Sequence, residues 1–313
     1  MRSLFLKIFL WFWLSVILIS STLVIIAIIT HSDSDRAEWQ NQAIVAAEAA
    51  QSVDTYEREG PAALKKHFDN FPKRPMNIAD RIARLRDEIA AAAHRAGRHP
   101  EEVSLMAVSK NFPPESIAVA YDAGIRLFGE NRVQEFAAKK PGLARLRDAT
   151  WHLIGHLQTN KAARAVELFD AIDSLDSLRL ARKLDHAARE LPRRLPVLIE
   201  INIGGEEAKS GVLSDSQELQ ELLGTAPQLA GLEFHGLMTI PPYHDDPNHS
   251  RPYFRKMRGL FERLARLKLE GLAMETLSMG MSHDFQIAIE EGATSVRVGT
   301  AIFGERKSAR SDE

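Results

Sequence analysis

The residue of this sequence best suited to covalent chemistry is a lysine at the end of an apolar run. Lys110 follows the segment Val103–Ser109, and lysine rarely closes so apolar a segment without a partner or a task. In a semi-enclosed apolar environment an amine loses its proton readily, and a neutral amine can attack an aldehyde to form an imine. The alternative is a lysine whose charged end reaches solvent past the strand. Position alone leaves both interpretations open.

A second group of residues is suited to holding a phosphate. Gly299 and Thr300 offer a close backbone approach and a hydroxyl, and the helical turn that starts at Ala301 offers free N–H groups. Ser282, which follows an earlier strand-like segment, can donate from the other side. A plain tight turn that uses glycine for its backbone freedom is the alternative.

Arg297 directly precedes this segment. If the side chain points inward, its guanidinium can face a ring nitrogen and leave that nitrogen unprotonated, because arginine does not readily give up a proton. An arginine paired with a carboxylate inside the fold is the alternative.

Metal and thiol chemistry are poorly supported. The chain has no cysteine, which excludes disulfides, thiolate nucleophiles and Cys-based zinc sites. His244, Asp245, Asp246 and His249 gather in a proline-flanked segment, which we interpret as a solvated surface loop and not as a metal site. We interpret His152, inside a strand-like segment, as a hydrogen-bonded structural residue.

These residues follow a regular alternation of strand-like and helix-like segments from Met76 onward. Such an alternation predicts a (β/α)8 barrel, in which active groups lie at the carboxyl ends of the strands and in the loops after them. No Gly-x-Gly-x-x-Gly turn follows the first strand, which disfavours a doubly wound open sheet. The predicted strands are Val103–Ser109, Arg126–Gly129, Trp151–Gly155, Ala171–Ser174, Val197–Asn202, Glu233–Thr239, Thr276–Met279 and Ser295–Val298. The predicted helices include Ile78–Ala96, Pro114–Ala123, Leu178–Glu190, Asp215–Thr225, Arg251–Lys268 and Phe285–Glu291.

The chain before the barrel has a different character. From Ile8 to Thr30 there is no charged residue, which predicts one transmembrane helix, with a cleaved signal peptide or a buried soluble helix as alternatives. Residues 31–75 are polar and partly helical, and the two prolines Pro72 and Pro75 mark a boundary. We therefore expect a transmembrane helix in 1–30, a polar sensor-like segment in 31–75, the barrel in 76–306 and a disordered tail in 307–313.

Several ordered motifs of the barrel resemble the pyridoxal phosphate homeostasis protein family, also called the YggS or PROSC family. Together they cover Met76 to about Arg306, and as a set they are specific to that family. The matching segments are Leu105–Lys110, Phe128–Glu135, Trp151–Lys161, Ile201–Asn202, Lys209–Gly211, Gly236–Met238, Leu277–Ser282 and Val296–Gly304.

The resemblance implies a barrel related to the N-terminal domain of alanine racemase, with pyridoxal 5′-phosphate (PLP) as cofactor. It implies that Lys110 forms a Schiff base with PLP and that Arg297 faces its pyridine nitrogen. Ser282, Gly299 and Thr300 would hold the phosphate, and the pocket lining would include Asn131, Asn202 and Met238. His283 departs from the family, where an acidic residue is more usual, and it can alter the charge beside the phosphate.

The implied function is intracellular PLP homeostasis, by buffering or delivery, without a robust catalytic activity. The alternative is an amino-acid racemase, which needs a second base, a tyrosine from a further domain; the chain ends shortly after Gly304 and none of its tyrosines has the matching context. We expect a monomeric barrel whose partners are PLP, PLP-dependent apoenzymes and, through the N-terminal helix, a membrane. A net charge of −2 gives no pull toward nucleic acid.

The first 75 residues resemble the membrane anchor of envelope-sensing histidine kinases, so the chain looks like a fusion near Pro75 and Met76. Arg2 and Lys7 precede the apolar run, and Asp33 and Asp35 follow it, a pattern that favours a cytoplasmic N-terminus and an external barrel. The family resemblance instead implies a cytoplasmic barrel, and the sequence leaves this conflict open.

Overall fold

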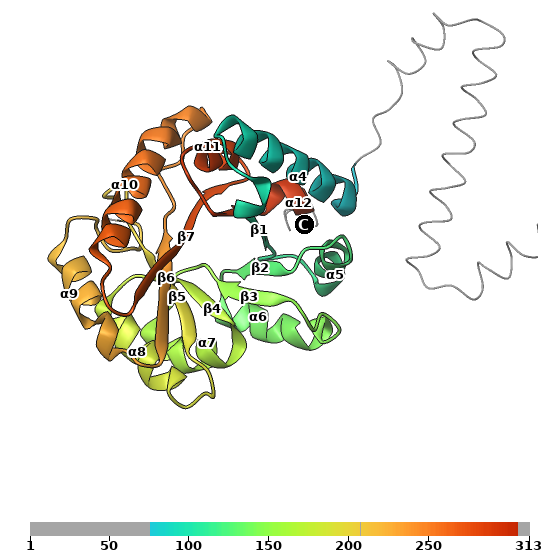
Figure 1. Ribbon diagram of the computed structural model, residues 1–313. Helices are drawn as coiled ribbons and strands as arrows, with labels where there is room; N and C mark the ends of the chain where they lie inside the picture. The colour runs from blue at the N-terminus through green and yellow to red at the C-terminus, as the bar shows by residue number, and fades with distance from the viewer. Residues whose placement is uncertain (1–75, 207, 306–313) are drawn as a thin grey trace, which may run out of the picture. The chain divides into compact units, whose positions relative to one another are not determined.

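A computed structural model describes residues 76–206 and 208–305, and the chain divides into two units between Pro75 and Met76. In the described part, eight parallel strands form a closed barrel in chain order, with β8 paired to β1 (Figure 1). This confirms the predicted (β/α)8 architecture. The strands are β1 (Ser104–Val108), β2 (Leu127–Glu130), β3 (Thr150–Leu153), β4 (Ala171–Leu175), β5 (Leu195–Glu200), β6 (Leu232–Met238), β7 (Leu272–Met281) and β8 (Ser295–Val298).

Helices follow the strands and form the outer ring of the barrel (Figure 1). Short 3-10 turns at Pro100–Glu102, Lys140–Leu143, Thr159–Lys161, Ala226–Gln228 and Pro247–Ser250 complete the described secondary structure. The α-helices are α4 (Ile78–Arg95), α5 (Pro114–Asp122), α6 (Val133–Lys139), α7 (Ala162–Leu168), α8 (Leu178–Ala188), α9 (Gln217–Thr225), α10 (Arg251–Leu267), α11 (Phe285–Glu290) and α12 (Thr300–Phe303).

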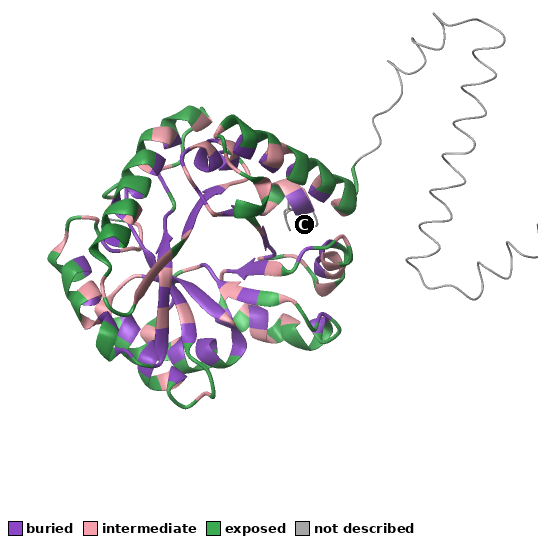
Figure 2. Ribbon diagram, viewed as in Figure 1, coloured by how far each residue is buried: buried purple, intermediate pink, exposed green. Residues whose placement is uncertain are grey.

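The hydrophobic core lies in two places. A large apolar cluster fills the space between strands and helices, and a small one of Met106, Val108 and Ile154 lies on the inner side of the barrel, where it lines the cavities at the barrel ends. Figure 2 shows the strands mostly buried and the outer faces of the helices exposed. Burial on both faces explains why the strands read as continuous apolar runs and not as alternating ones.

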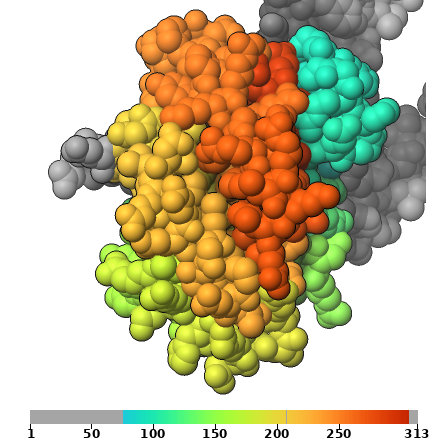
Figure 3. Space-filling view, turned by 60° about the vertical axis from the view of Figure 1, so that its left-hand side comes forward, coloured from blue at the N-terminus to red at the C-terminus, as the bar shows by residue number. Residues whose placement is uncertain are grey.

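The first helix closes the ring against the last elements of the barrel. Asn77 caps α4 reciprocally with Asp80, and the apolar face of α4 packs against α11 and α12. Figure 3 shows this early segment, in cyan, beside the orange-red C-terminal segments on one face of the molecule.

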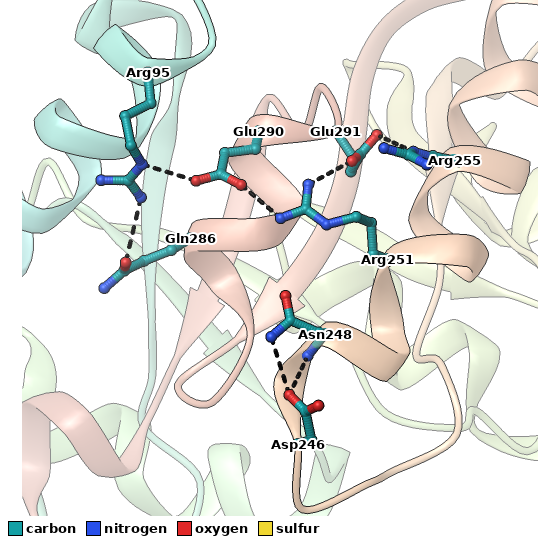
Figure 4. A network of polar contacts seen from close by, with 8 residues as sticks. All are labelled: Arg95, Asp246, Asn248, Arg251, Arg255, Gln286, Glu290 and Glu291. Carbon is teal, nitrogen blue, oxygen red and sulfur yellow. Dashed lines mark hydrogen bonds and ion pairs between the residues drawn. The ribbon is translucent and has the colours of Figure 1, made fainter.

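An ion-pair network strengthens the same junction (Figure 4). Glu290 of α11 accepts from Arg95 of α4 at 2.8 Å and from Arg251 of α10 at 2.7 Å. Glu291 accepts from Arg251 at 2.6 Å and from Arg255 at 3.1 Å. Because several charges share partners, we expect this network to contribute more than an isolated surface ion pair does.

The predicted element positions agree with the structure, apart from their ends. The largest difference is β7, which starts four residues before the predicted Thr276. Its first residues, Leu272–Glu275, are only partly buried or exposed, so they gave no continuous apolar signal.

The predicted membrane span at Ile8–Thr30 and the polar segment 31–75 lie outside the described residues. Among residues 76–206 and 208–305, no helix has the length and apolar character needed to cross a membrane.

Gly236 of β6 gives a test of the barrel geometry. Its φ is +147°, and an added Cβ would overlap the carbonyl oxygen of Thr276 on β7. We expect Gly236→Ala to lower the free energy of unfolding by about 3 kcal/mol, measured by urea denaturation. Gly259→Ala, inside α10 where an added Cβ meets nothing within 4 Å, should instead raise it by up to about 1 kcal/mol. Equal effects of the two substitutions would contradict this packing.

Candidate functional site

A cavity of about 550 Å³ opens at the carboxyl ends of the barrel strands. Such a position is where (β/α)8 barrels carry their active groups. Six of the eight residues predicted from the sequence line it, namely Lys110, Asn131, Ser282, Arg297, Gly299 and Thr300. The other lining residues are Val108, Phe112, Ile154, Gly155, His156, Glu200, Ile201, Ala208, Lys209, Ser210, Ile240, Tyr243, Met281 and His283.

Lys110 stands two residues beyond the end of β1, on the wall formed by the first strands. Phe112, which follows it closely, stacks on Phe303 of α12 with ring centroids 4.7 Å apart. Because β1 pairs with β8, this stacking ties the loop after β1 to the loop after β8. The lysine and the Gly299 segment therefore belong to neighbouring walls of one cavity.

The Gly299 segment and Ser282 form a small polar recess. The Ser282 Oγ accepts from the backbone N–H of Gly299 at 3.2 Å and from that of Ala301 at 3.4 Å. An added Cβ on Gly299 would meet only Val108, at 3.4 Å or more, so the protein itself does not exclude a side chain there. Ser282, Gly299 and Thr300 line the cavity, where a hydroxyl and backbone N–H groups converge in a way that suits an anionic group.

Arg297 is buried inside the barrel, beneath the cavity. Its terminal nitrogens donate to the Ser278 Oγ and to the Thr239 carbonyl oxygen, both at 2.7 Å. Burial lowers the pKa of the guanidinium, while the carboxylates of Asp173 and Glu200 act to raise it. These hydrogen bonds fix the plane of the guanidinium against the cavity floor.

Glu200, at the end of β5, was not singled out from the sequence. Its side chain lines the cavity and is buried, and its Oε2 atom has no hydrogen-bond partner among the described residues. Burial, together with the nearby charge of Asp176, raises the pKa of Glu200 to about 7. The criterion that identified Lys110, a charged residue closing an apolar strand, would also have identified Glu200.

The remaining predicted residues lie differently. Asn131 lines the cavity, and its backbone approaches Gly155 so closely that a Cβ there would overlap the Asn131 carbonyl oxygen. Asn202 does not line this cavity; its side chain donates to the Glu206 carbonyl oxygen at 2.8 Å and accepts from the Glu206 N–H at 3.2 Å. Asn202 thus shapes the loop after β5. Met238 is fully buried and does not line the cavity either.

The histidines fall into structural and surface roles. His152 pairs with the buried Asp173 at 2.9 Å, which confirms its interpretation as a hydrogen-bonded barrel residue. Although burial acts to lower the pKa of His152, Asp173 leaves it above its ordinary value. His283 lies at the cavity wall, where its Nε2 contacts the His244 carbonyl oxygen at 3.1 Å and its ring packs near Tyr243. His283 thus links the loops after β6 and β7.

Comparison with known sequences identifies close relatives of the described barrel. The family of alanine racemase N-terminal domains matches residues 81–307. The pyridoxal phosphate homeostasis protein of Aquifex aeolicus (strain VF5) is 47% identical over 232 residues, which are 74% of this chain and 100% of that protein. Its counterpart in Escherichia coli (strain K12) is 45% identical over 233 residues, 74% of this chain and 97% of that protein.

Solved structures of similar proteins share the barrel fold of this chain. PipY of Synechococcus elongatus PCC7942, with PLP bound, has a TM-score of 0.64 and 41% identity, and the match covers 73% of this chain and all of that one. Alanine racemase of Clostridium difficile 630 has a TM-score of 0.52 at 15% identity, with 76% of this chain and 59% of that one covered. The racemase shares the fold alone.

The pKa of Glu200 predicts how stability depends on pH. The neutral carboxyl is favoured in the folded barrel, so the stabilisation is complete below pH 4.5 and is lost as the pH rises through about 7. At about 1.4 kcal/mol for each pKa unit, the free energy of unfolding should fall by up to roughly 3 kcal/mol relative to Glu200→Gln between these limits. Urea denaturation of both proteins without ligand, at pH 4.5 and pH 8, measures this. A difference between the two proteins that does not change with pH would refute the assignment.

Proposed function

The chain belongs to the pyridoxal phosphate homeostasis protein family, and we propose that it binds PLP and buffers or delivers it inside the cell, without a robust catalytic activity of its own. The observation that carries this proposal is one cavity with Lys110 on one wall and the Ser282–Gly299 recess on the neighbouring wall. An amine and an anion-binding recess on the same cavity suit a phosphorylated aldehyde.

The residues present fit PLP on three counts. The Ser282 hydroxyl and the lining residues Gly299 and Thr300 suit the phosphate. The Lys110 amine suits the aldehyde carbon, to which it would bind covalently. Arg297 lies on the cavity floor, where its guanidinium can face the ring nitrogen.

The surrounding lining would complete the pocket. Asn131 contributes directly, whereas Asn202 would act by shaping the loop after β5 and Met238 by packing in the core behind the lining. When bound, PLP would supply an electrophilic carbon conjugated to its ring. A guanidinium facing the ring nitrogen does not give up its proton, so the ring would be a weaker electron sink than a protonated one, which suits a protein that holds the cofactor.

The comparisons support the homeostasis assignment over racemase activity. The relatives that are 45–47% identical are named homeostasis proteins, while alanine racemase resembles the chain at 15% identity. PLP-dependent apoenzymes are the class of protein to which a PLP carrier would deliver its ligand.

Lys110 gives the first test of this proposal. The wild-type chain mixed with PLP should gain an absorption band in the near-visible range, and borohydride reduction followed by peptide mass mapping should place the label on Lys110. Lys110→Ala should lose both signals, because the amine that forms the bond is absent. Lys256→Ala, on the exposed face of α10, should keep them. A wild-type protein that stays colourless with PLP would overturn the cofactor assignment.

Ser282 tests the phosphate recess separately. Ser282→Ala removes one hydroxyl that would contact the phosphate, so we expect PLP to bind about fivefold more weakly, which corresponds to a hydrogen bond of about 1 kcal/mol. Pyridoxal, which lacks the phosphate, should bind the variant and the wild type equally. An equal loss for both ligands, measured by absorbance titration, would place the Ser282 effect elsewhere than at the phosphate.

We also propose that the uncharged segment Ile8–Thr30 anchors the chain in a membrane. Its length fits a span of roughly 20 apolar residues. The full chain should then remain in the membrane fraction after an alkaline carbonate wash, and deletion of residues 1–75 should release the barrel. A full chain extracted by carbonate would refute the anchor. Protease protection in inverted vesicles would then decide between the external barrel of the charge rule and the cytoplasmic barrel of the family.

A further inference from the structure

The peptide groups on both sides of Lys110 are held by one helix. Lys139, near the end of α6, donates to the carbonyl oxygen of Ser109 at 3.0 Å. Glu135, one helical turn earlier, accepts from the backbone N–H of Asn111 at 2.5 Å. Glu135 and Lys139 are themselves joined by an ion pair of 2.7 Å, so the two backbone contacts belong to one connected set of side chains.

The Lys139 ammonium lies in an almost closed position. Its side chain is 10% exposed, and it donates to the Glu130 Oε1 and Oε2 atoms at 3.0 and 3.1 Å. Glu130 is completely buried and also accepts from the Ser109 hydroxyl at 2.7 Å. Burial raises the pKa of Glu130, an effect that the Lys139 charge opposes. Lys139 therefore binds both the backbone and, through Glu130, the side chain of Ser109.

Asn111 shows that the loop is held in a specific conformation. Its φ is +63°, a left-handed backbone that asparagine tolerates better than most residues but that still needs support. The Glu135 carboxylate supplies that support. Although burial acts to raise the pKa of Glu135, its hydrogen bonds with Lys139 and the Asn111 N–H leave that pKa below its ordinary value. Glu135 thus acts as an anion.

A lysine side chain is long and flexible, so its reactivity depends on where its Cα is held and in which direction it starts. Fixing the carbonyl group before Lys110 and the N–H after it restricts both. A displacement of about 1 Å at a reacting group can reduce a rate by up to 10²-fold, and a supporting shell is what prevents such a displacement.

We propose that Glu135 and Lys139 are positioning residues that hold the backbone on both sides of Lys110 and thereby aim its amine into the cavity. This inference rests on the proposed reaction of Lys110 with PLP. It assigns to α6, which contributes no residue to the cavity lining, control over how fast and how selectively Lys110 is labelled.

The test compares labelling kinetics of the full chain with PLP, followed by borohydride trapping and peptide mass mapping. Lys139→Met keeps the length of the side chain but removes the charged donor, and we expect the rate constant for labelling Lys110 to fall about tenfold. Lys140→Met is the matched control, because this neighbouring lysine donates to the Leu168 carbonyl oxygen and does not touch the Lys110 loop. Its rate constant should stay within about twofold of the wild type.

Glu135 provides a graded series. Glu135→Gln keeps an oxygen that can accept from the Asn111 N–H but loses the ion pair, whereas Glu135→Ala loses both. We expect the labelling rate to fall in the order wild type, Glu135→Gln, Glu135→Ala, while circular dichroism shows that the barrel is folded. A purely structural role would change the melting temperature without this order.

The absence of cysteine allows a rescue experiment. Lys139→Cys, alkylated with 2-bromoethylamine in denaturant and refolded, regains an amine at the same position, and labelling should return to within about threefold of Lys140→Cys treated in the same way. Folded Lys139→Met, Glu135→Gln and Glu135→Ala that all label Lys110 at the wild-type rate would overturn the proposal. Should Lys139→Met not fold, the Glu135 series and the rescue decide. A wild type that is not labelled at Lys110 would instead refute the proposed function.

Discussion

Closure of the barrel between β1 and β8 is the constraint on which the site depends. Ala107 of β1 pairs with Val298 of β8. The segments that follow these two neighbouring strands therefore leave the sheet side by side, one leading to Lys110 and the other to Gly299. Residues nearly 190 positions apart thereby meet on one cavity. Two further contacts stabilise the pairing of β1 with β8: the stacking of Phe112 on Phe303, and the packing of α4 on α11 and α12. Any change that separates β1 from β8 would separate Lys110 from the recess of Ser282 and Gly299.

Charged side chains inside the barrel interact in succession from the end opposite the cavity to the cavity wall. At the opposite end from the cavity, His152 pairs with Asp173, whose charge also favours the protonated form of Arg297. Arg297 in turn acts to lower the pKa of Glu200 at the cavity wall. Buried charges are tolerated when they are compensated in this way. The Glu200 Oε2 atom is the exception, since it has no hydrogen-bond partner among the described residues. The desolvation free energy of this unpaired oxygen thus falls on a side chain that lines the cavity.

Much of the fold could be predicted because the signals are local. Short apolar runs bounded by polar residues mark the strands, and the position after each strand marks the active end of the barrel. Lys110, Ser282, Arg297 and Gly299 were found in this way. Met238, which the family resemblance assigned to the pocket lining, is fully buried at the end of β6 and does not line the cavity, because sequence does not show which packing layer receives a side chain. Asn202 differs again, since a loop that turns back over β5 takes its hydrogen bonds. The contacts of α6 with Ser109 and Asn111 join different elements, which a single sequence does not display. Glu200, by contrast, could have been identified as a charged residue at the end of an apolar strand.

The same contacts bear on why a barrel shared in fold with racemases would hold a cofactor instead of turning it over. Racemisation needs a cofactor that stabilises a carbanion and a second base, and both depend on groups that face the cavity. In the proposed site the ring would face a guanidinium that is fixed by Ser278 and Thr239 and cannot rotate away without breaking two short hydrogen bonds. The backbone on both sides of Lys110 is held by Glu135 and Lys139 of α6. Rigid support on both sides favours one bound arrangement of the ligand. This geometry suits retention of the ligand, and release would have to begin with movement of the loop after β1, which α6 restrains through Ser109 and Asn111.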